Sequence, residues 1–544
     1  MSHVRIAPLD LVEVDSNAPS SAQLRNAEDT ISDLHSQDAA PRGPDNIEPS
    51  AGFISNVIKL IGATLFAQIL SILASPIVTR LYDPEAYGLF AVFLSIIGIF
   101  GPLVCLRYNL AVMLPASDRD ASSVLWISII SAIVLSLAFA PLLLIFGQDL
   151  EVLLNAPGLS RLLLFVPVTM FAFGIFQSLT AWLMRTGKFG RLSAAQMARS
   201  VGVVGVQITA GLAGFATGGS LIVAALVGYI GGSATMGTVM LRNDSATLRA
   251  GFNWTAFRNG AQRYKKFPLY DTWSSLLTTV SWELPVFLLS SFFSVPVVGA
   301  YSLCFTVLQM PMSLVSSTLG QVFYPAAAAA KHVGESVLAH MVEEIVVRVF
   351  SLGIMPFAVL TVLGEPLFTI VFGSSWTEAG VFAQILAPSI FIIFLTSPIS
   401  SIFSVLELQQ ISLVQNIVII PFKITALVAG GVLGNPRIAL ALFSGVGVIY
   451  YSVILCYIVR KSSGSLRGIL SRIRLPLYQT FPIIGVLVVM RIVMPGSPLL
   501  MVATAMGGMI LFYISLVRRD PVVRAQIVSL LRRLSLSVPG WLEA

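Results

Sequence analysis

The sequence predicts an all-α integral membrane protein with about fourteen transmembrane helices, and two observations lead to this fold class. Of the 544 residues, 56% are hydrophobic and only 11% are charged, whereas an ordinary soluble domain is about 25% charged. Because so few charges cannot cover so apolar a chain, much of its surface must face lipid. Apolar runs also recur from Phe53 almost to the C-terminus, and a spanning helix needs roughly 20 such residues.

The N-terminal segment, residues 1–51, differs from the rest in being acidic and polar. It carries three basic residues against nine acidic ones and is rich in Ser, Asp, Ala and Pro. It lacks the basic and apolar regions of a signal peptide. A segment with so little to bury is expected to be a disordered acidic cytoplasmic tail.

Hydropathy divides the remaining chain into apolar segments that we expect to be the spanning helices. They lie at residues 53–78, 88–114, 122–146, 161–184, 193–216, 219–241, 268–292, 296–322, 341–371, 379–404, 411–433, 437–459, 476–494 and 498–517. A basic break separates the first six from the next six. The predicted domains are therefore an N-terminal six-helix half at 52–241, a basic cytoplasmic linker at 242–267, a C-terminal six-helix half at 268–460, an extra helix pair at 461–517 and a cytoplasmic basic amphipathic tail at 518–544.

The connections between these helices alternate in charge. Every second connection is rich in Lys and Arg, with examples at Arg119, Arg185, Lys188, Arg242, Arg249, Lys331, Arg460, Lys461, Arg518 and Arg519. The others offer little beyond Arg80, Arg161, Arg437 and Arg491. Since short cytoplasmic loops hold the excess of Lys and Arg, both termini of this multi-pass protein are expected in the cytoplasm.

The two predicted halves share a faint internal repeat. Each first hairpin carries a proline, a glycine beside an aromatic residue and a second proline, and the two prolines stand 26 residues apart in both: Pro76, Gly88 and Pro102, then Pro285, Gly299 and Pro311. Internal repeats are common in secondary transporters. The pattern weakly favours that class.

Motifs for soluble-enzyme chemistry are absent from the sequence. There is no P-loop, no H-E-x-x-H and no nucleophile elbow, and Cys105, Cys304 and Cys456 form no C-x-x-C pair. The predicted outer loops are short, whereas membrane glycosyltransferases and polymerases usually place their chemistry on large outer loops. We therefore expect no catalytic residues, no metal site, no cofactor and no enzyme activity.

Charged residues within the apolar segments are the strongest functional signal, because such residues are costly at bilayer depth and usually face a cavity. They are Lys59, Arg107, Arg199, Lys423 and Glu283, with Asp271 at the start of a helix. Lys59, Arg107 and Arg199 could instead snorkel to the cytoplasmic face. Glu283 and Lys423 could neutralise one another as a structural pair, and Asp271 could be interfacial.

The predicted intramembrane set is mostly cationic, which bears on the substrate. Lys and Arg hold phosphates or acidic sugars, and Arg can grip phosphate oxygens with two hydrogen bonds. A cationic drug would require a cavity dominated by carboxylates. We therefore predict that Lys59, Arg107, Arg199, Lys423 and Glu283 line a substrate-binding cavity for an anionic cargo.

Several segments resemble the Wzx-type polysaccharide and O-antigen flippases of the MOP superfamily, which also contains the MATE drug exporters and the lipid II flippase. In the first half they are Ser75–Phe90 and Leu106–Pro115. In the second half they are Lys266–Tyr270, Leu284–Phe287, Gly299–Tyr301 and Gly320–Pro325. The resemblance spans residues 52–460. Where this family often has Gln, the chain has Glu283.

The resemblance implies a V-shaped bundle of two six-helix halves around a central cavity. It implies alternating-access translocation of undecaprenyl-diphosphate-linked oligosaccharide across the bacterial inner membrane, for lipopolysaccharide or exopolysaccharide synthesis. Since no ATP site is visible in the sequence, the expected drive is an ion gradient, with Na+ or H+ as the coupling ion, or the membrane potential. A polysaccharide polymerase and glycosyltransferases are the expected protein partners, with membrane lipid around the chain and no nucleic acid. Carried over by position, Arg80, Asp83 and Gly88 form a structural motif.

Two other functions stay open at this point. A MATE-type multidrug or cation antiporter would share the superfamily and the bundle, and a membrane polysaccharide polymerase would share the pathway. The short outer loops and the cationic interior favour the flippase over both.

Overall fold

The computed structural model describes residues 51–313, 317–406, 408–519 and 524, and every regular element among them is a helix. The chain forms two compact units, Met1–Asn56 and Val57–Ala544. The predicted tail at 1–51 lies outside the described residues except for Ala51. The predicted tail at 518–544 lies outside them except for Arg518, Arg519 and Arg524. All contacts given below are within Val57–Ala544.

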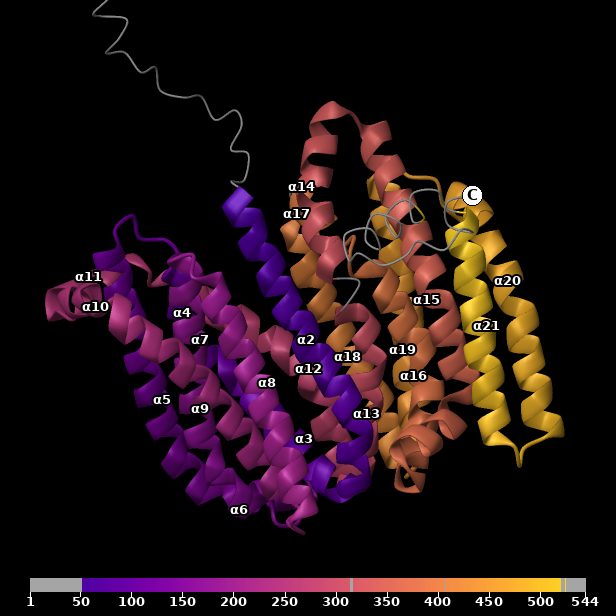
Figure 1. The fold of residues 1–544 in the computed structure, drawn as a ribbon, viewed down its shortest axis with the longest axis horizontal. Coiled ribbons are helices and arrows are strands. Elements are labelled where there is room, and N and C mark those ends of the chain that lie inside the picture. The colour runs from indigo at the N-terminus through magenta and orange to yellow at the C-terminus, as the bar shows by residue number, and fades with distance from the viewer. Residues whose placement is uncertain (1–50, 314–316, 407, 520–523, 525–544) are drawn as a thin grey trace, which may run out of the picture. The chain divides into compact units, whose positions relative to one another are not determined.

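The first group of helices follows the N-terminal half of the sequence. It comprises α2 (Ala51–Leu81), α3 (Pro84–Val104), α4 (Tyr108–Ala111), α5 (Asp118–Leu153), α6 (Leu159–Leu163), α7 (Phe165–Arg185), α8 (Phe189–Leu212) and α9 (Gly218–Asn243). Helix α8 packs along α9, α7 packs against α5 and α9, and α3 packs against α7 and α9 (Figure 1). The connecting segment also folds, into α10 (Ser245–Gly251) and α11 (Trp254–Arg263).

The second group contains the remaining helices. It comprises the π-helix η1 (Phe267–Asp271), α12 (Thr272–Phe292), α13 (Val295–Pro311), α14 (Ser317–Val333), α15 (Glu335–Phe372), the 3₁₀-helix η3 (Ser374–Trp376), α16 (Thr377–Thr396), α17 (Ile402–Val405), α18 (Gln409–Val432), α19 (Pro436–Lys461), α20 (Leu466–Val493) and α21 (Pro498–Arg519). Helix α16 packs between α15 and α19, and α18 lies along α19. The last pair, α20 and α21, packs against α15.

Eleven helices among the described residues are long and apolar enough to cross a membrane. The other predicted spans coincide with α8, which carries Arg191 and Arg199, and with the shorter apolar helices Val295–Pro311 and Ile417–Val432. The prediction of an all-α, multi-pass membrane protein is therefore confirmed. The count of fourteen stays a prediction.

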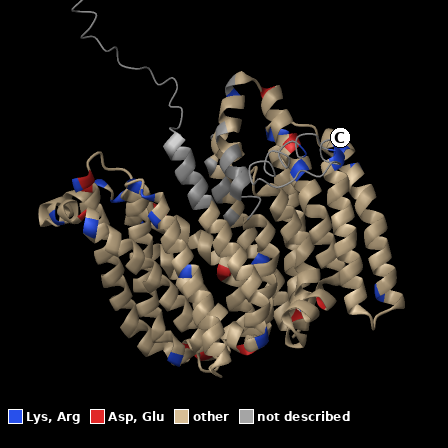
Figure 2. Cartoon of the chain, in the orientation of Figure 1, with Lys and Arg blue, Asp and Glu red and all other residues tan. Residues whose placement is uncertain are grey.

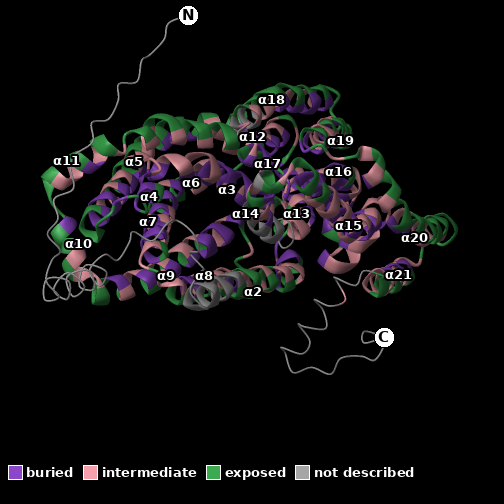
Figure 3. Ribbon diagram, turned by 90° about the horizontal axis from the view of Figure 1, so that it is seen from above, coloured by how far each residue is buried: buried purple, intermediate pink, exposed green. Residues whose placement is uncertain are grey.

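The exposed faces of the helices have the chemistry of a lipid-facing surface. Large apolar side chains such as Leu144 and Ile145 on α5 and Phe481 on α20 are about two-thirds exposed. Exposed positions line the outer edges of the bundle and buried ones its interior (Figure 3). Lys, Arg, Asp and Glu gather at the ends of the helices, and few lie midway along them (Figure 2).

The two groups of helices meet where α3 crosses α13, and glycine makes this crossing possible. A Cβ atom on Gly88 would lie 2.1 Å from the carbonyl oxygen of Val295 on α13. A Cβ on Gly299 would lie 2.0 Å from the carbonyl oxygen of Pro84 on α3. The two glycines of the sequence repeat thus occupy reciprocal positions at one contact.

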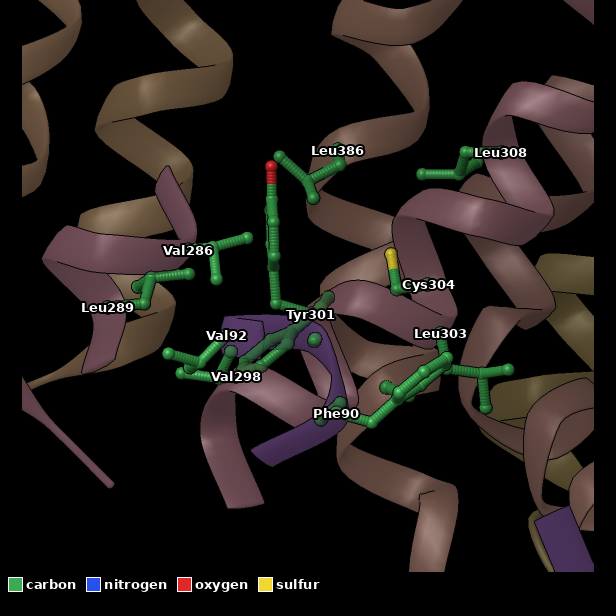
Figure 4. Close-up of a cluster of buried hydrophobic side chains, with 14 of the residues drawn as sticks. Phe90, Val92, Val286, Leu289, Val298, Tyr301, Leu303, Cys304, Leu308 and Leu386 are labelled. Carbon is green, nitrogen blue, oxygen red and sulfur yellow. The ribbon is translucent and has the colours of Figure 1, made fainter. Parts of the chain in front are cut away.

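The core extends from this crossing into both groups. Phe90 and Val92 of α3 lie among Val286 of α12, Tyr301 of α13 and Leu386 of α16, and all five are buried. Figure 4 shows the Tyr301 ring extending between Val286 and Leu386. One continuous apolar core therefore joins the two groups, although they are separated in sequence by the linker.

The resembling segment Ser75–Phe90 builds the end of the bundle where α3 and α13 begin, which we call the crossing end. Asp83 caps α3, because its side chain accepts a hydrogen bond of 2.8 Å from the Ala86 amide. The Arg80 guanidinium donates to the Ile370 carbonyl near the end of α15. The Trp376 indole donates across the groups to the Thr79 carbonyl at 2.8 Å. These contacts hold the crossing end shut.

Candidate functional site

A large cavity of about 620 Å³ lies between the two groups of helices and is called the central cavity here. Its walls come from α2, α7 and α8 on one side and from α13 on the other. The lining residues are Thr64, Ala67, Gln68, Ser71, Ile72, Phe176, Gln196, Arg199, Ser200, Val203, Phe305, Thr306, Gln309, Met310 and Ser313. None of these is acidic, so Arg199 supplies the only formal charge among the described lining residues.

The Arg199 guanidinium is held in place by aromatic rings. Its carbon atom lies 4.5 Å from the centroid of the Tyr229 ring and 5.4 Å from that of Phe176, within cation–π range. One terminal nitrogen donates to the Tyr229 hydroxyl at 3.3 Å. The buried Nε atom has no hydrogen-bond partner among the described residues. A pre-positioned guanidinium with a free donor is suited to bind an anionic group.

Glu283 lies in a second cavity of about 510 Å³, called the Glu283 cavity, between α3, α12 and α13. One carboxylate oxygen accepts a 2.6 Å hydrogen bond from the Ser95 hydroxyl. The other lies in a space kept open by Gly98, whose Cβ would come within 3.0 Å of it. Phe305, Thr306 and Gln309 line both this cavity and the central one. The single acidic residue predicted for the site thus lies across α13 from Arg199.

Arg107 lies at a break in the backbone, whereas the sequence predicted a continuous helix at 88–114. Helix α3 ends at Val104, and Leu106 and Arg107 adopt left-handed φ angles of 45° and 60°, which bulky residues rarely adopt. This break directs Arg107 toward Asp271, with 2.7 Å between Nε and Oδ2. The side chain also lines a cavity of about 190 Å³ with Asn109 and Gln177. Sequence reasoning missed this ion pair.

Lys423 occupies a separate small cavity of about 20 Å³, called the Lys423 cavity, inside the second group of helices. Its ammonium lies 5.5 Å from the centroids of both the Trp282 and Phe443 rings. The suggested ion pair with Glu283 is not formed: the structure places the Glu283 carboxylate against Ser95 instead. The backbone of Lys59 lies in α2, but its side chain is outside the described residues.

The predicted intramembrane charges are therefore not gathered in one chamber. Arg199, Arg107 and Lys423 line three different cavities, and Glu283 lines a fourth that adjoins the first through α13. Uncharged polar residues of the central cavity, above all Gln68, Gln196 and Gln309, were missed from the sequence. These residues could have been found in the sequence, because an amide side chain is unusual within an apolar helix.

Two groups of long apolar helices that share a core and enclose cavities define a multi-pass membrane protein. Residues 77–381 match the family described as "Polysaccharide biosynthesis protein". Because the match covers more than half of the 544 residues, the chain belongs to this family. The resemblance seen in the sequence is thereby confirmed.

Solved structures agree on the fold. The chain is similar to the lipid II flippase MurJ in its inward closed conformation, with 13% identity and a TM-score of 0.64 over 85% of this chain and 98% of that one. It is also similar to an inward-facing multidrug resistance MATE family transporter of the MOP superfamily, with 17% identity and a TM-score of 0.60 over 73% and 94% of the respective chains. The expected MOP-like fold is confirmed. Comparison with curated protein sequences gives no match.

Proposed function

We propose that this protein is a flippase that moves an undecaprenyl-diphosphate-linked oligosaccharide from the inner to the outer leaflet of the bacterial inner membrane. The single observation that carries the proposal is Arg199, a half-buried cation fixed by aromatic rings in a large cavity with no acidic residue in its described lining. A cavity of this charge suits a diphosphate or an acidic sugar and disfavours a cationic drug. Membership of a polysaccharide biosynthesis family supports the saccharide.

The placement of the cavity supports an alternating-access mechanism. Residues 305–313, which line it, lie at and just beyond the end of α13 opposite the crossing end, and residues 64–72 line it from midway along α2. The crossing end is held by the Gly88–Gly299 contact and by Trp376. If the basic end faces the cytoplasm, as the loop charges predict, the head group enters from inside. Opening of the crossing end then releases the glycan outside, while the lipid stays in the bilayer.

Glycosyltransferases would supply this substrate and a polysaccharide polymerase would consume it. A deletion strain tests the proposal directly. We expect the lipid-linked saccharide to accumulate on the cytoplasmic leaflet, where it is protected from a membrane-impermeant glycan-oxidising reagent added to spheroplasts. Unpolymerised units exposed on the outer leaflet would indicate a polymerase instead. Lower drug tolerance with normal surface glycan would indicate a MATE-type antiporter.

We further propose that Glu283 couples transport to an ion gradient by binding H+ or Na+. The carboxylate lies in the cavity beside the central one, and its hydrogen bond to Ser95 joins α12 to α3, two helices from different groups. Glu283→Gln keeps an oxygen that can accept from Ser95 but removes the charge. We expect transport in proteoliposomes to become insensitive to an imposed pH or sodium gradient.

The control for this prediction is Ser95→Ala, which removes the hydrogen bond and leaves the carboxylate. That variant should retain its response to the gradient. If Glu283→Gln responds to both gradients as the unmodified protein does, Glu283 is not the coupling group.

A further inference from the structure

Lys423 is buried in the second group of helices without any compensating acidic side chain. The residue is 6% exposed, and the described residues provide no hydrogen-bond or ion-pair partner for its ammonium. The lining of its cavity contains no Asp or Glu. Glu283, on the adjoining α12, directs its carboxylate to Ser95 on α3. A buried charge in this position requires a partner, because its desolvation is costly.

The lining of the Lys423 cavity is rich in hydrogen-bond donors. Ser281 of α12, Tyr301 of α13, Ser389 of α16 and Tyr451 of α19 contribute hydroxyl groups. None of these hydroxyls has a hydrogen-bond partner among the described residues. The ammonium and the hydroxyls thus form a set of donors from several helices around one small space.

Gly447 preserves the shape of this space. A Cβ on Gly447 would lie 2.2 Å from the Ser389 hydroxyl oxygen, so any side chain there would displace Ser389. The remaining volume is about 20 Å³, and roughly 10–15 Å³ suffices for one water molecule. The space therefore suits a monatomic ion and is too small for a phosphate or a sugar.

Three aromatic residues separate this space from the larger cavities. The Tyr301 and Phe305 rings are stacked with centroids 5.5 Å apart, and Trp282 lies 6.5 Å from Phe305. All three line both the Lys423 cavity and the Glu283 cavity, and Phe305 also lines the central cavity. A head group in the central cavity therefore meets this aromatic layer before it reaches Lys423.

We propose that the Lys423 cavity is a chloride site, distinct from the substrate cavity. The ammonium supplies the counter-charge and the hydroxyls of Ser281, Ser389 and Tyr451 supply donors. The Trp282 and Phe443 faces stabilise the ammonium itself. Bound chloride then connects α12, α16, α18 and α19, and it stabilises the folded protein because it binds the folded state preferentially.

Equilibrium binding of radioactive chloride to the purified full-length protein in detergent tests this site, with gluconate as the replacement anion. We expect saturable binding to the unmodified protein and its loss in Lys423→Met. Replacing gluconate by chloride at constant ionic strength should also raise the melting temperature of the unmodified protein and leave that of Lys423→Met unchanged.

Three further variants make the outcome decisive. Lys461→Met, which removes an exposed lysine at the end of α19, should bind chloride normally. Arg199→Gln should do so as well, which separates this site from the substrate cavity. Gly447→Ala should weaken binding even if Lys423→Met does not fold. Absence of saturable binding in the unmodified protein, or binding that survives in Lys423→Met, overturns the proposal and leaves the flippase function untouched.

Discussion

Replacing Arg199 by Gln should lower surface glycan by about tenfold or more while the protein still inserts into the membrane. A hydrogen bond to a charged group contributes about 1.5–3 kcal/mol, and Arg199 carries the only charge among the described lining residues of the central cavity. Gln keeps a polar side chain of moderate size, so the helix packing should be preserved. Surface glycan in a deletion strain that carries each variant on a plasmid is the measurement, normalised to protein in the membrane.

Matched variants distinguish a binding role for Arg199 from a structural one. Arg242→Gln removes an exposed arginine at the end of α9 and should leave export unchanged. Tyr229→Phe removes the 3.3 Å hydrogen bond but keeps the ring beneath the guanidinium, so export should fall only slightly. Arg199→Lys should restore part of the export, because the charge returns without the planar geometry. Normal glycan in Arg199→Gln would remove the main physical support for the proposed function.

The second large effect is expected at the crossing of α3 and α13. In Gly88→Ala, the new methyl group would lie 2.1 Å from the Val295 carbonyl oxygen, so the two helices must separate. Overpacking of this kind costs about 1–3 kcal/mol. We expect a lower melting temperature of the purified protein in detergent and reduced export, since the crossing end can no longer close.

The internal repeat provides a second test of the same contact. Gly299→Ala should have a similar effect, because its methyl group would meet the Pro84 carbonyl oxygen at 2.0 Å. The control is Gly445→Ala in α19, where a Cβ meets nothing within 4 Å. There the melting temperature should stay the same or rise, because Ala is the better helix former. Equal stability of Gly88→Ala and Gly445→Ala would show that the crossing tolerates separation.

Much of the fold could be predicted because a spanning helix requires a long run of apolar residues, which is visible in the sequence. The predicted segment 341–371 corresponds to α15 (Glu335–Phe372), and 437–459 corresponds to α19 (Pro436–Lys461). The prediction of one helix at 88–114 was wrong, because the break at Leu106 and Arg107 contains no glycine to mark it. The break brings Arg107 into an ion pair with Asp271, a residue distant in sequence, and such a contact could not be predicted from local composition.

The sequence by itself determined the membrane class, the family likeness and which charged residues stand within apolar segments, because each of these depends on local composition. Only the tertiary structure decided what those charges face. Arg199, Arg107 and Lys423 looked alike in the sequence, yet the first lines a large open cavity, the second pairs with Asp271 and the third lies in a small donor-lined space. The physical reason is that a side chain's electrostatic partners are set by the face it occupies on its helix and by neighbours that packing brings from far along the chain.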